Sequence, residues 1–445
     1  MKILHYSLGF PPYRTGGMTK YCMDLMLLQK RNKHEVALLW PGTILPFLPK
    51  TKIRRKKQVM GIGSYEIINP LPVPLDEGVT KPERFIKSVK AEVFRRFLLQ
   101  YSPDVIHLHT LMGLPVEFAD AAKELGIRTV FTTHDYFGLC PKVTFFCEGA
   151  ECQEDHGCRK CVLCNGCGLS LSKIYLIQSP PYRILKNFAL VKKLRKRHRS
   201  QFFETAEKEN ISNRHVSADE IKEYQAFRNY YISFLKKIDR IHYNSHVTKE
   251  KYERYVKLPE SKVISITHGD IRDNRRKKQF TGKLKILYLS PLKLFKGYHL
   301  LLDALDELWQ EGVQDFELHI CTENLSEKPY IRTFAPYQYT QLPEIFDRAH
   351  VLAAPSIWKE TFGFTVLEAL SFGVPVIVSE NVGAKDLLGD HKMGFIVEPK
   401  KESLKQLVAE LIDNRRLLEE ANDAIVNSDM KAWGKSGDIE TLYKQ

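Results

Sequence analysis

Two glutamates, Glu360 and Glu368, bracket a short glycine-containing loop with seven residues between them. The pattern over residues 355–369 predicts a strand, a loop and then a helix, so that the loop lies at the amino end of the helix. Such an end offers unpaired N–H groups and a partial positive charge, which suit a diphosphate. Gly363 allows the backbone to approach a ligand closely, and carboxylates accept hydrogen bonds from sugar and ribose hydroxyls. On spacing alone, Glu360 could equally be a helix-terminal acid and Glu368 a surface residue.

The same segment resembles the Glu-x7-Glu donor signature of retaining glycosyltransferases of the GT-B fold, especially family 4. The likeness continues through Gly373-Val374-Pro375-Val376-Ile377, Gly383 and Gly394-Phe395-Ile396-Val397 with Pro399. It implies an α/β protein with two Rossmann-like parallel-sheet lobes that face each other across a cleft. The implied catalytic residues are His134, Lys296 and Glu360. The implied donor-binding residues are Gly16, Gly17, Ser290, Thr361, Phe362, Gly363, Phe364 and Glu368.

The amino-terminal half carries further parts of this resemblance. Gly9-Phe10-Pro11-Pro12 followed by Gly16-Gly17-Met18 resembles the glycine loop after the family's first strand. Residues 104–109 and 133–137 match its next two strand ends. We therefore expect His134 beside the reacting carbon and a structural role for His107.

One departure concerns the diphosphate. After the first strand of the second lobe the family has Gly-Arg-Leu and then Lys-Gly, whereas this chain has Pro291 where the arginine would be. Lys296 is present, so one of two expected cations is missing, and Lys293 could compensate only from another position.

These residues need a framework of alternating strands and helices, which the apolar pattern predicts in both halves. We expect an amino-terminal, acceptor-binding lobe over 1–270, with a Cys-rich and basic insertion at 138–235. A charged linker is expected at 271–283 and a nucleotide-sugar-binding lobe at 284–429. By resemblance, a last helix over 430–445 crosses back to the first lobe.

Seven of the nine cysteines fall between Cys140 and Cys167. Thiolates two residues apart suit a tetrahedral metal, most often zinc, although iron–sulfur clusters use similar spacing. The most regular set is Cys158, Cys161, Cys164 and Cys167, and Cys140, Cys147 or Cys152 could replace one of them. Unmetallated thiols remain the alternative. We expect a structural zinc and no metal cofactor in catalysis, because no acidic pair resembles the metal-binding carboxylates of other transferases.

The formal net charge of +14 indicates an anionic partner. One basic run covers residues 50–57, and a longer basic region over 170–215 contains apolar residues at roughly helical spacing: Ile184, Leu185, Phe188, Leu190, Val191 and Leu194. This pattern favours an amphipathic helix on an anionic membrane, with nucleic acid as the competing partner. The first residues lack a signal-peptide pattern, and no apolar run is long enough to span a bilayer. We expect a cytoplasmic protein, peripheral at the inner face of the cell membrane.

The function that these features predict is retaining, hexosyl-type transfer from a nucleotide-diphosphate sugar. The expected acceptor is a lipid-linked saccharide or an oligosaccharide, in the biosynthesis of a surface polysaccharide such as a capsule or exopolysaccharide. The alternatives are a GT-B phosphorylase or epimerase acting on soluble sugars, and a zinc-dependent nucleic-acid-binding protein. The last has no use for the Glu-x7-Glu loop, so we expect no nucleic-acid partner.

Overall fold

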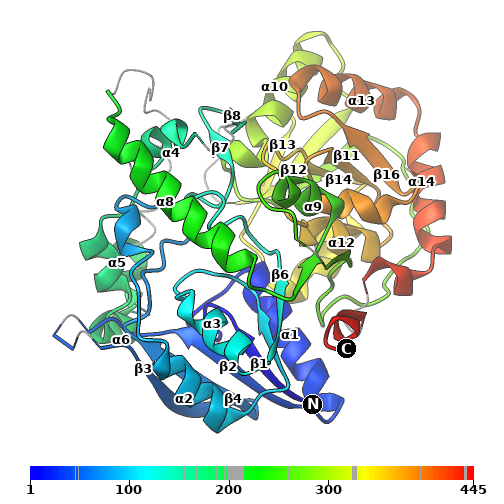
Figure 1. Ribbon diagram of the computed structural model, residues 1–445. Helices are drawn as coiled ribbons and strands as arrows, with labels where there is room; N and C mark the ends of the chain where they lie inside the picture. The colour runs from blue at the N-terminus through cyan, green and yellow to red at the C-terminus, as the bar shows by residue number, and fades with distance from the viewer. Residues whose placement is uncertain are drawn as a thin grey trace. The chain divides into compact units, whose positions relative to one another are not determined.

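The computed structural model describes residues 1–445 except 46, 49, 154–156, 167, 187, 190, 195–196, 198–214, 259, 323–327, 391, 435–437 and 445. Figure 1 shows the course of the chain. The chain divides into two compact units. Unit 1 comprises Met1–Asn244, Lys249–Ile264 and Ser436–Gln445, and unit 2 comprises Ser245–Thr248 and Ser265–Lys435.

Unit 1 is built on an eight-stranded sheet with the strand order β10-β9-β6-β5-β1-β2-β4-β3. Seven strands are parallel: β1 (Lys2–Tyr6), β2 (Glu35–Pro41), β4 (Ile62–Ile68), β5 (Val105–Leu108), β6 (Arg128–Thr132), β9 (Arg240–Tyr243) and β10 (Ser261–Val263). Only β3 (Lys52–Val59) among these strands runs antiparallel, against β4. The central strands are almost wholly buried, as expected for a parallel sheet covered on both faces. The basic run at residues 50–57 thus forms most of an edge strand.

The helices of unit 1 include α1 (Gly17–Arg31), α2 (Glu92–Tyr101), α3 (Glu117–Glu124) and α9 (His246–Glu253), whose first turn belongs to unit 2. The predicted insertion contains β7 (Phe146–Cys147), β8 (Ala150–Glu151), α4 (Arg159–Cys164), α5 (Leu171–Ile177), α6 (Pro180–Leu185) and α8 (Ala218–Leu235). Ser217 and Glu220 form a capping box at the start of α8, which packs against α4. Much of the predicted basic amphipathic helix, including residues 198–214, lies outside the described residues.

Unit 2 contains a six-stranded parallel sheet with the order β13-β12-β11-β14-β15-β16. The strands are β11 (Leu284–Tyr288), β12 (Phe316–Cys321), β13 (Ile331–Phe334), β14 (Val351–Ala354), β15 (Val376–Ser379) and β16 (Gly394–Val397). The helices are α10 (Tyr298–Gln310), α11 (Leu342–Asp347), α12 (Phe364–Ser371), α13 (Lys401–Asp413) and α14 (Arg416–Asn427). Counted within the unit, the strand order is 3-2-1-4-5-6, that of a doubly wound dinucleotide-binding sheet. Ligands of such sheets bind outside the carboxyl ends of the strands where the order reverses, which here is between β11 and β14.

The two Rossmann-like lobes expected from the sequence are therefore present. Residues 271–283, suggested as a linker, belong to unit 2, where Arg275 Nη1 donates to the carbonyls of Ile425 and Ser428 at 2.8 and 2.7 Å. Where one last helix was expected, the described residues form two short 3-10 turns, Met430–Trp433 in unit 2 and Asp438–Leu442 in unit 1. No helix in the described ranges has the length and apolar character needed to cross a bilayer.

Candidate active site

Lys296 and Glu360 meet in unit 2, at the carboxyl ends of the two strands where the strand order reverses. Lys296 follows β11, and Glu360 follows β14. The Nζ atom of Lys296 lies 2.6 Å from Oε1 of Glu360, and Ser356 Oγ donates to Oε2 at 2.6 Å. Both charged side chains are mostly shielded, with exposed fractions of 13% and 16%. Two of the predicted catalytic residues thus form a pre-organised ion pair.

The loop after β11, which carries Lys296, packs by its backbone against the loop after β14, which carries Glu360. Gly297 has a φ of 72°, and a Cβ atom at this position would lie 1.8 Å from the carbonyl oxygen of Pro355. The amides of Ile357 and Trp358 both donate to the carbonyl of Phe295, at 2.9 and 3.2 Å. Only glycine meets both requirements at position 297, the positive φ and the close approach.

The loop after Glu360 leads directly into the amino end of α12, as the sequence predicts. Gly363, with a φ of 105°, is the N-cap of α12 and supplies no side-chain cap to the N–H groups of the first turn. The loop itself is fixed from outside, because Ser245 Oγ donates to the carbonyl of Thr361 at 2.7 Å and the amide of Ala384 donates to that of Phe362 at 2.7 Å. This rigid helix start suits an anionic ligand.

Glu368 is buried, with 7% of its surface exposed, so the alternative of a surface residue is wrong. Its Oε1 accepts hydrogen bonds from Tyr339 OH at 2.7 Å and from His268 Nε2 at 3.2 Å. Burial, and then the nearby Glu368 carboxylate, raise the pKa of Tyr339. Sequence reasoning missed both partners. The only signal was that His268 stands near residue 270, where the first lobe was expected to end.

Position 291 holds an exposed proline whose carbonyl accepts a hydrogen bond from Tyr288 OH at 3.1 Å. The Nζ atom of Lys293 lies 5.1 Å from the centre of the Phe295 ring, on the same loop as Lys296. The Nζ atom of Lys296 lies 5.2 Å from the ring of Trp358, an aromatic neighbour that the sequence did not single out. Ser290 is half-buried at the start of this loop.

In unit 1 the predicted residues lie around β6 and the start of α1. Gly16 is the N-cap of α1, Gly17 is its first residue, and Tyr21 one turn later lies 4.9 Å from the ring of His134. His134 follows β6 and is half-buried, and its Nε2 lies 3.3 Å from Nδ1 of His109. Burial, with a smaller contribution from His242, lowers the pKa of His134 to about 3. Burial raises the pKa of the neighbouring Asp135 to about 6.

His107, expected to be structural, is fully buried on β5. Its Nδ1 lies 2.7 Å from Tyr443 OH and its Nε2 lies 2.7 Å from Thr132 Oγ1. Burial and the neighbouring histidines lower its pKa well below the ordinary value. The contact with Tyr443 attaches the end of the chain to the centre of the unit 1 sheet.

Two family models match the chain, one in each half. Residues 270–428 match the model of glycosyl transferases group 1, and residues 15–146 match that of glycosyltransferase family 4. Together they cover more than half of the chain, and they fall on the two Rossmann-like sheets described above. The chain is a GT-B glycosyltransferase of the family 4 type.

Two relatives that match part of this family 4 chain are glycosyltransferases by name. O-antigen chain mannosyltransferase B of Escherichia coli is 28% identical over 123 residues, which are 28% of this chain and 30% of that protein. D-inositol 3-phosphate glycosyltransferase of Corynebacterium efficiens is 22% identical over 211 residues, 42% of this chain and 50% of that protein. The matched parts therefore span half or less of these relatives.

Sucrose-phosphate synthase from Thermosynechococcus elongatus has a TM-score of 0.57 at 13% identity, covering 99% of this chain and 98% of that one. The Anabaena protein HepE, in complex with UDP and glucose, has a TM-score of 0.55 at 13% identity, covering 100% and 97%. At this identity the likeness shows the fold.

The cysteine segment of this family 4 chain arranges its described thiols in pairs. The thiol of Cys161 donates a hydrogen bond to Cys158, and this is the largest of the effects that raise the pKa of Cys161. The thiol of Cys164 donates one to Cys147, which is the largest of the effects that raise the pKa of Cys164. Arg228 Nη2 donates to Cys161 Sγ at 3.2 Å. Of the most regular predicted set, Cys167 lies outside the described residues. Among the residues that are described, only His5, His107 and His109 form a group of three metal-ligand atoms within 4.8 Å of one another.

Proposed function

We propose that the chain transfers a sugar from a nucleotide-diphosphate sugar to a lipid-linked saccharide or oligosaccharide, with retention of anomeric configuration. The observation that carries this proposal is the Lys296–Glu360 pair, 2.6 Å apart beside the glycine-capped start of α12. Several relatives support it in name: a mannosyltransferase of the O-antigen chain, an inositol-phosphate glycosyltransferase, and a neighbour solved with UDP and glucose.

The chemistry follows from where charge grows during transfer. The nucleoside diphosphate leaves with increasing negative charge, which fixed cations and N–H groups stabilise more strongly in the transition state than in the ground state. We assign this role to Lys296 and to the N–H groups of Thr361–Phe364. Glu360 would accept from hydroxyls of the donor sugar, Glu368 from the ribose, and His134 would lie beside the reacting carbon.

Lys296→Ala tests the donor site directly. Because Pro291 stands in place of the second cation, the variant should bind a nucleoside diphosphate about tenfold more weakly or worse, which corresponds to one lost charge-assisted bond. Isothermal titration calorimetry with UDP, GDP and ADP measures this, after a thermal-shift screen has selected the base. Lys392→Ala, which removes an exposed lysine of the same unit, is the matched control. Unchanged affinity in Lys296→Ala would exclude the residue as a phosphate contact.

We propose further that unit 1 binds an anionic membrane and its lipid-linked acceptor through one basic and apolar surface. A cavity of about 970 Å³ in this unit is lined by six cations and by Glu92. The cations are Lys50, Lys52, Arg84, Lys87, Lys90 and Arg96. A cavity with this charge suits a phosphate or diphosphate headgroup.

Exposed apolar side chains lie beside that cavity and along the segment that continues from α5 through α6. Tyr175 of α5 lines it, and the amide of Ile44 donates to the carbonyl of Gln178 at 3.1 Å, which links α5 to the loop carrying Phe47. Exposed fractions are high for Phe47 (96%), Ile184 (73%), Leu176 (61%), Phe188 (60%) and Leu194 (58%). Apolar side chains gathered beside cations are typical of a membrane-contacting surface. This supports a peripheral position at the inner face of the cell membrane and a role in surface polysaccharide assembly.

A vesicle-binding experiment tests this surface. Lys192→Glu/Lys193→Glu reverses two exposed cations between Phe188 and Leu194 of this surface. It should release the protein from vesicles containing anionic lipid, at about 1 kcal/mol per basic residue, while transfer to a soluble acceptor analogue continues. Lys392→Glu/Lys431→Glu makes the same charge change on unit 2 and should bind vesicles normally. Equal binding by both variants would exclude the surface, and sedimentation with DNA in place of vesicles would favour the nucleic-acid alternative.

We also propose that the cysteine segment binds a structural zinc. Two thiol pairs, Cys158 with Cys161 and Cys147 with Cys164, support it, and Cys140 interacts electrostatically with both pairs. No three sulfurs of the described cysteines lie within 4.8 Å of one another, so zinc would have to draw the two pairs together as it replaced the thiol protons. Its binding energy would then go into folding. Elemental analysis of protein purified without added metal should find about one zinc per chain. Finding neither zinc nor iron, with all seven thiols freely titratable, would reject the metal.

A further inference from the structure

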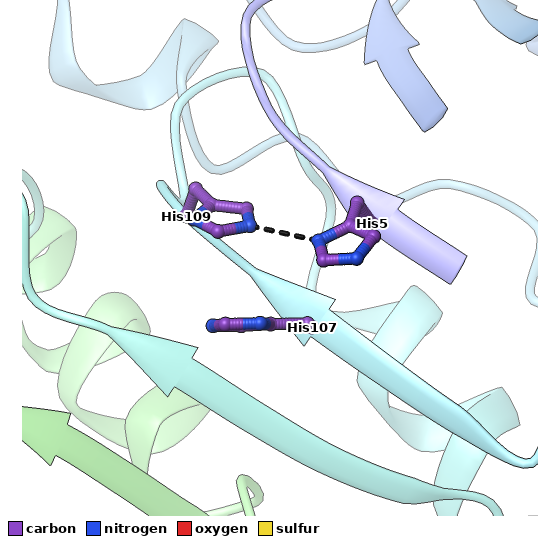
Figure 2. Close-up of side chains that lie close together, drawn as sticks. All are labelled: His5, His107 and His109. Atoms are coloured by element: carbon purple, nitrogen blue, oxygen red, sulfur yellow. Dashed lines mark hydrogen bonds between the residues drawn. The ribbon is translucent and has the colours of Figure 1, made fainter. Parts of the chain in front are cut away.

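A continuous chain of hydrogen bonds crosses the centre of the unit 1 sheet and ends at His134. It runs through side chains of four neighbouring strands, of α1 and of the chain's last turn. Its members in order are Ile264 O, His242, Thr132, His107, Tyr443, Gln29, His5, His109 and His134. Figure 2 shows three of its imidazoles, those of His5, His107 and His109, with the bond between His5 and His109 dashed.

The direction of the chain follows from its fixed end. The carbonyl of Ile264 can only accept, so His242 must carry its proton on Nε2, at 2.7 Å. Burial lowers the pKa of His242 to about 4, so the ring is neutral and its Nδ1 accepts from Thr132 Oγ1 at 2.8 Å. Because the hydroxyl proton of Thr132 is donated to His242, Thr132 Oγ1 accepts from His107 Nε2 at 2.7 Å.

The same logic continues through Tyr443. A neutral His107 has a bare Nδ1, which accepts from Tyr443 OH at 2.7 Å, and the phenol in turn accepts from Gln29 Nε2 at 3.1 Å. This orientation leaves Gln29 Oε1 to accept from His5 Nε2 at 2.7 Å. A flipped amide would force Tyr443 to donate twice, so the chain also fixes the orientation of Gln29.

The last two links set the tautomer of His134. His5 has used its only proton, so its Nδ1 accepts from His109 Nε2 at 2.9 Å. His109 Nδ1 then accepts from His134 Nε2 at 3.3 Å. Every neutral ring in the chain therefore donates through Nε2 and accepts through Nδ1, so that Nδ1 is the acceptor nitrogen of His134.

We infer that this chain is a positioning device that holds His134 in its neutral Nε2–H tautomer, so that Nδ1 accepts a hydrogen bond from a hydroxyl of the bound sugar. That the ligand is a sugar rests on the proposed function, whereas the tautomer of His134 follows from the hydrogen bonds alone. The other side chains of the chain act through His134 and are positioning residues: His5, His107, His109, His242, Thr132, Gln29 and Tyr443.

A metal ion held by His5, His107 and His109 is the competing interpretation, because their ligand atoms lie within 4.8 Å of one another. Hydrogen bonds within the chain already use both nitrogens of each of these rings. None of the nine linked groups is a carboxylate, and all three rings are fully buried, so a divalent ion here would carry uncompensated charge. The chain accounts for every one of these nitrogens without an ion.

Nitrogen NMR on histidine-labelled protein tests the inference, with the His134 signal assigned from its absence in His134→Gln. The wild type should show a protonated Nε2 and a bare Nδ1. Tyr443→Phe removes the central link, and should give a mixture of tautomers at His134 and lower turnover by about two- to tenfold. Tyr101→Phe is the matched control, because its buried hydroxyl has no hydrogen-bond partner among the described residues. Thr132→Val breaks the chain at another link if Tyr443→Phe does not fold.

The outcomes separate the chain from the proposed function. A bare Nε2 at His134 in the wild type, or a tautomer unchanged in both Tyr443→Phe and Thr132→Val, would overturn the chain even if sugar transfer were measured. The expected tautomers without detectable transfer would instead reject the proposed function. One bound metal per chain that is lost in His107→Gln would also overturn the inference.

Discussion

The candidate residues of the two units are organised in opposite ways. In unit 2 the centre is a charged pair, Lys296 with Glu360, fixed by backbone that packs on backbone at Gly297 and Pro355. In unit 1 the centre is a neutral chain of side chains that ends at His134. An ion pair can interact with charge on a ligand. A chain of hydrogen bonds between neutral groups that all point one way instead holds the residue at its end in one protonation state. The division fits a reaction in which the diphosphate carries the charge and the sugar needs orientation.

The largest expected effect comes from the backbone contact of unit 2. Gly297→Ala introduces a Cβ 1.8 Å from the carbonyl oxygen of Pro355, in a residue with positive φ. Gly312→Ala, with a φ of 85° and nothing within 4 Å, carries only the conformational cost. We expect Gly312→Ala to lose about 1 kcal/mol of unfolding free energy and Gly297→Ala to lose about 3 kcal/mol or more. Urea unfolding measures both. Equal losses would show that backbone packing does not set this site.

A smaller effect is expected from the charge in the pair itself. Glu360→Gln keeps the size of the side chain but removes the ion pair and one charge-assisted acceptor. Turnover should fall about 10- to 100-fold, since such a bond contributes about 1.5–3 kcal/mol, while the fold stays intact by circular dichroism. Glu344→Gln changes an exposed glutamate of α11 and should be silent. A Glu360→Gln enzyme with more than half of wild-type turnover would remove Glu360 from the site.

The smallest effect concerns the neutrality of the histidine chain. Burial lowers the pKa of His5 and of His242 to about 4, below the value near 6.5 of an unfolded histidine. The unfolded chain therefore binds more protons, so this stability is complete above pH 6.5 and is lost as the pH falls towards 4. We expect a loss of about 1 kcal/mol per histidine by pH 5.5, partly offset by Asp135, whose pKa is raised to about 6.

Urea unfolding at pH 7.5 and 5.5 measures this loss. His5→Gln should reduce the pH dependence, and His215→Gln, which changes an exposed histidine, should leave it unchanged. If both variants kept the wild-type dependence, the chain would not be the neutral structure described above.

The unit 2 site was predictable because its parts are close in sequence. Glu360, Gly363 and Glu368 lie on one loop and the helix after it, and the strand, loop and helix pattern places them. The histidine chain was not predictable, because it joins residues as distant as Gln29 and Tyr443. Its strand residues His5, His107, Thr132 and His242 become neighbours only through the order of the strands in the sheet.

Two further differences have similar causes. The basic run at 50–57 shows no apolar alternation, so an edge strand whose partner is β4 could not be recognised in it. Residues 271–283 looked like a linker because six of them are Lys or Arg. In the structure, backbone carbonyls of unit 2 accept hydrogen bonds from Arg275 and Lys278, and Phe280 enters the core.

The two edge strands of the unit 1 sheet affect whether this protein aggregates at high concentration. An open sheet edge exposes unpaired N–H and C=O groups to which a strand of another molecule can add. One edge here, β10, is only three residues long, and the other, β3, has the sequence KIRRKKQV and an almost fully exposed face. Like charges on β3 would repel a second copy before any ladder could form. Lys52, one of the cations that line the 970 Å³ cavity, therefore also belongs to the strand that opposes aggregation.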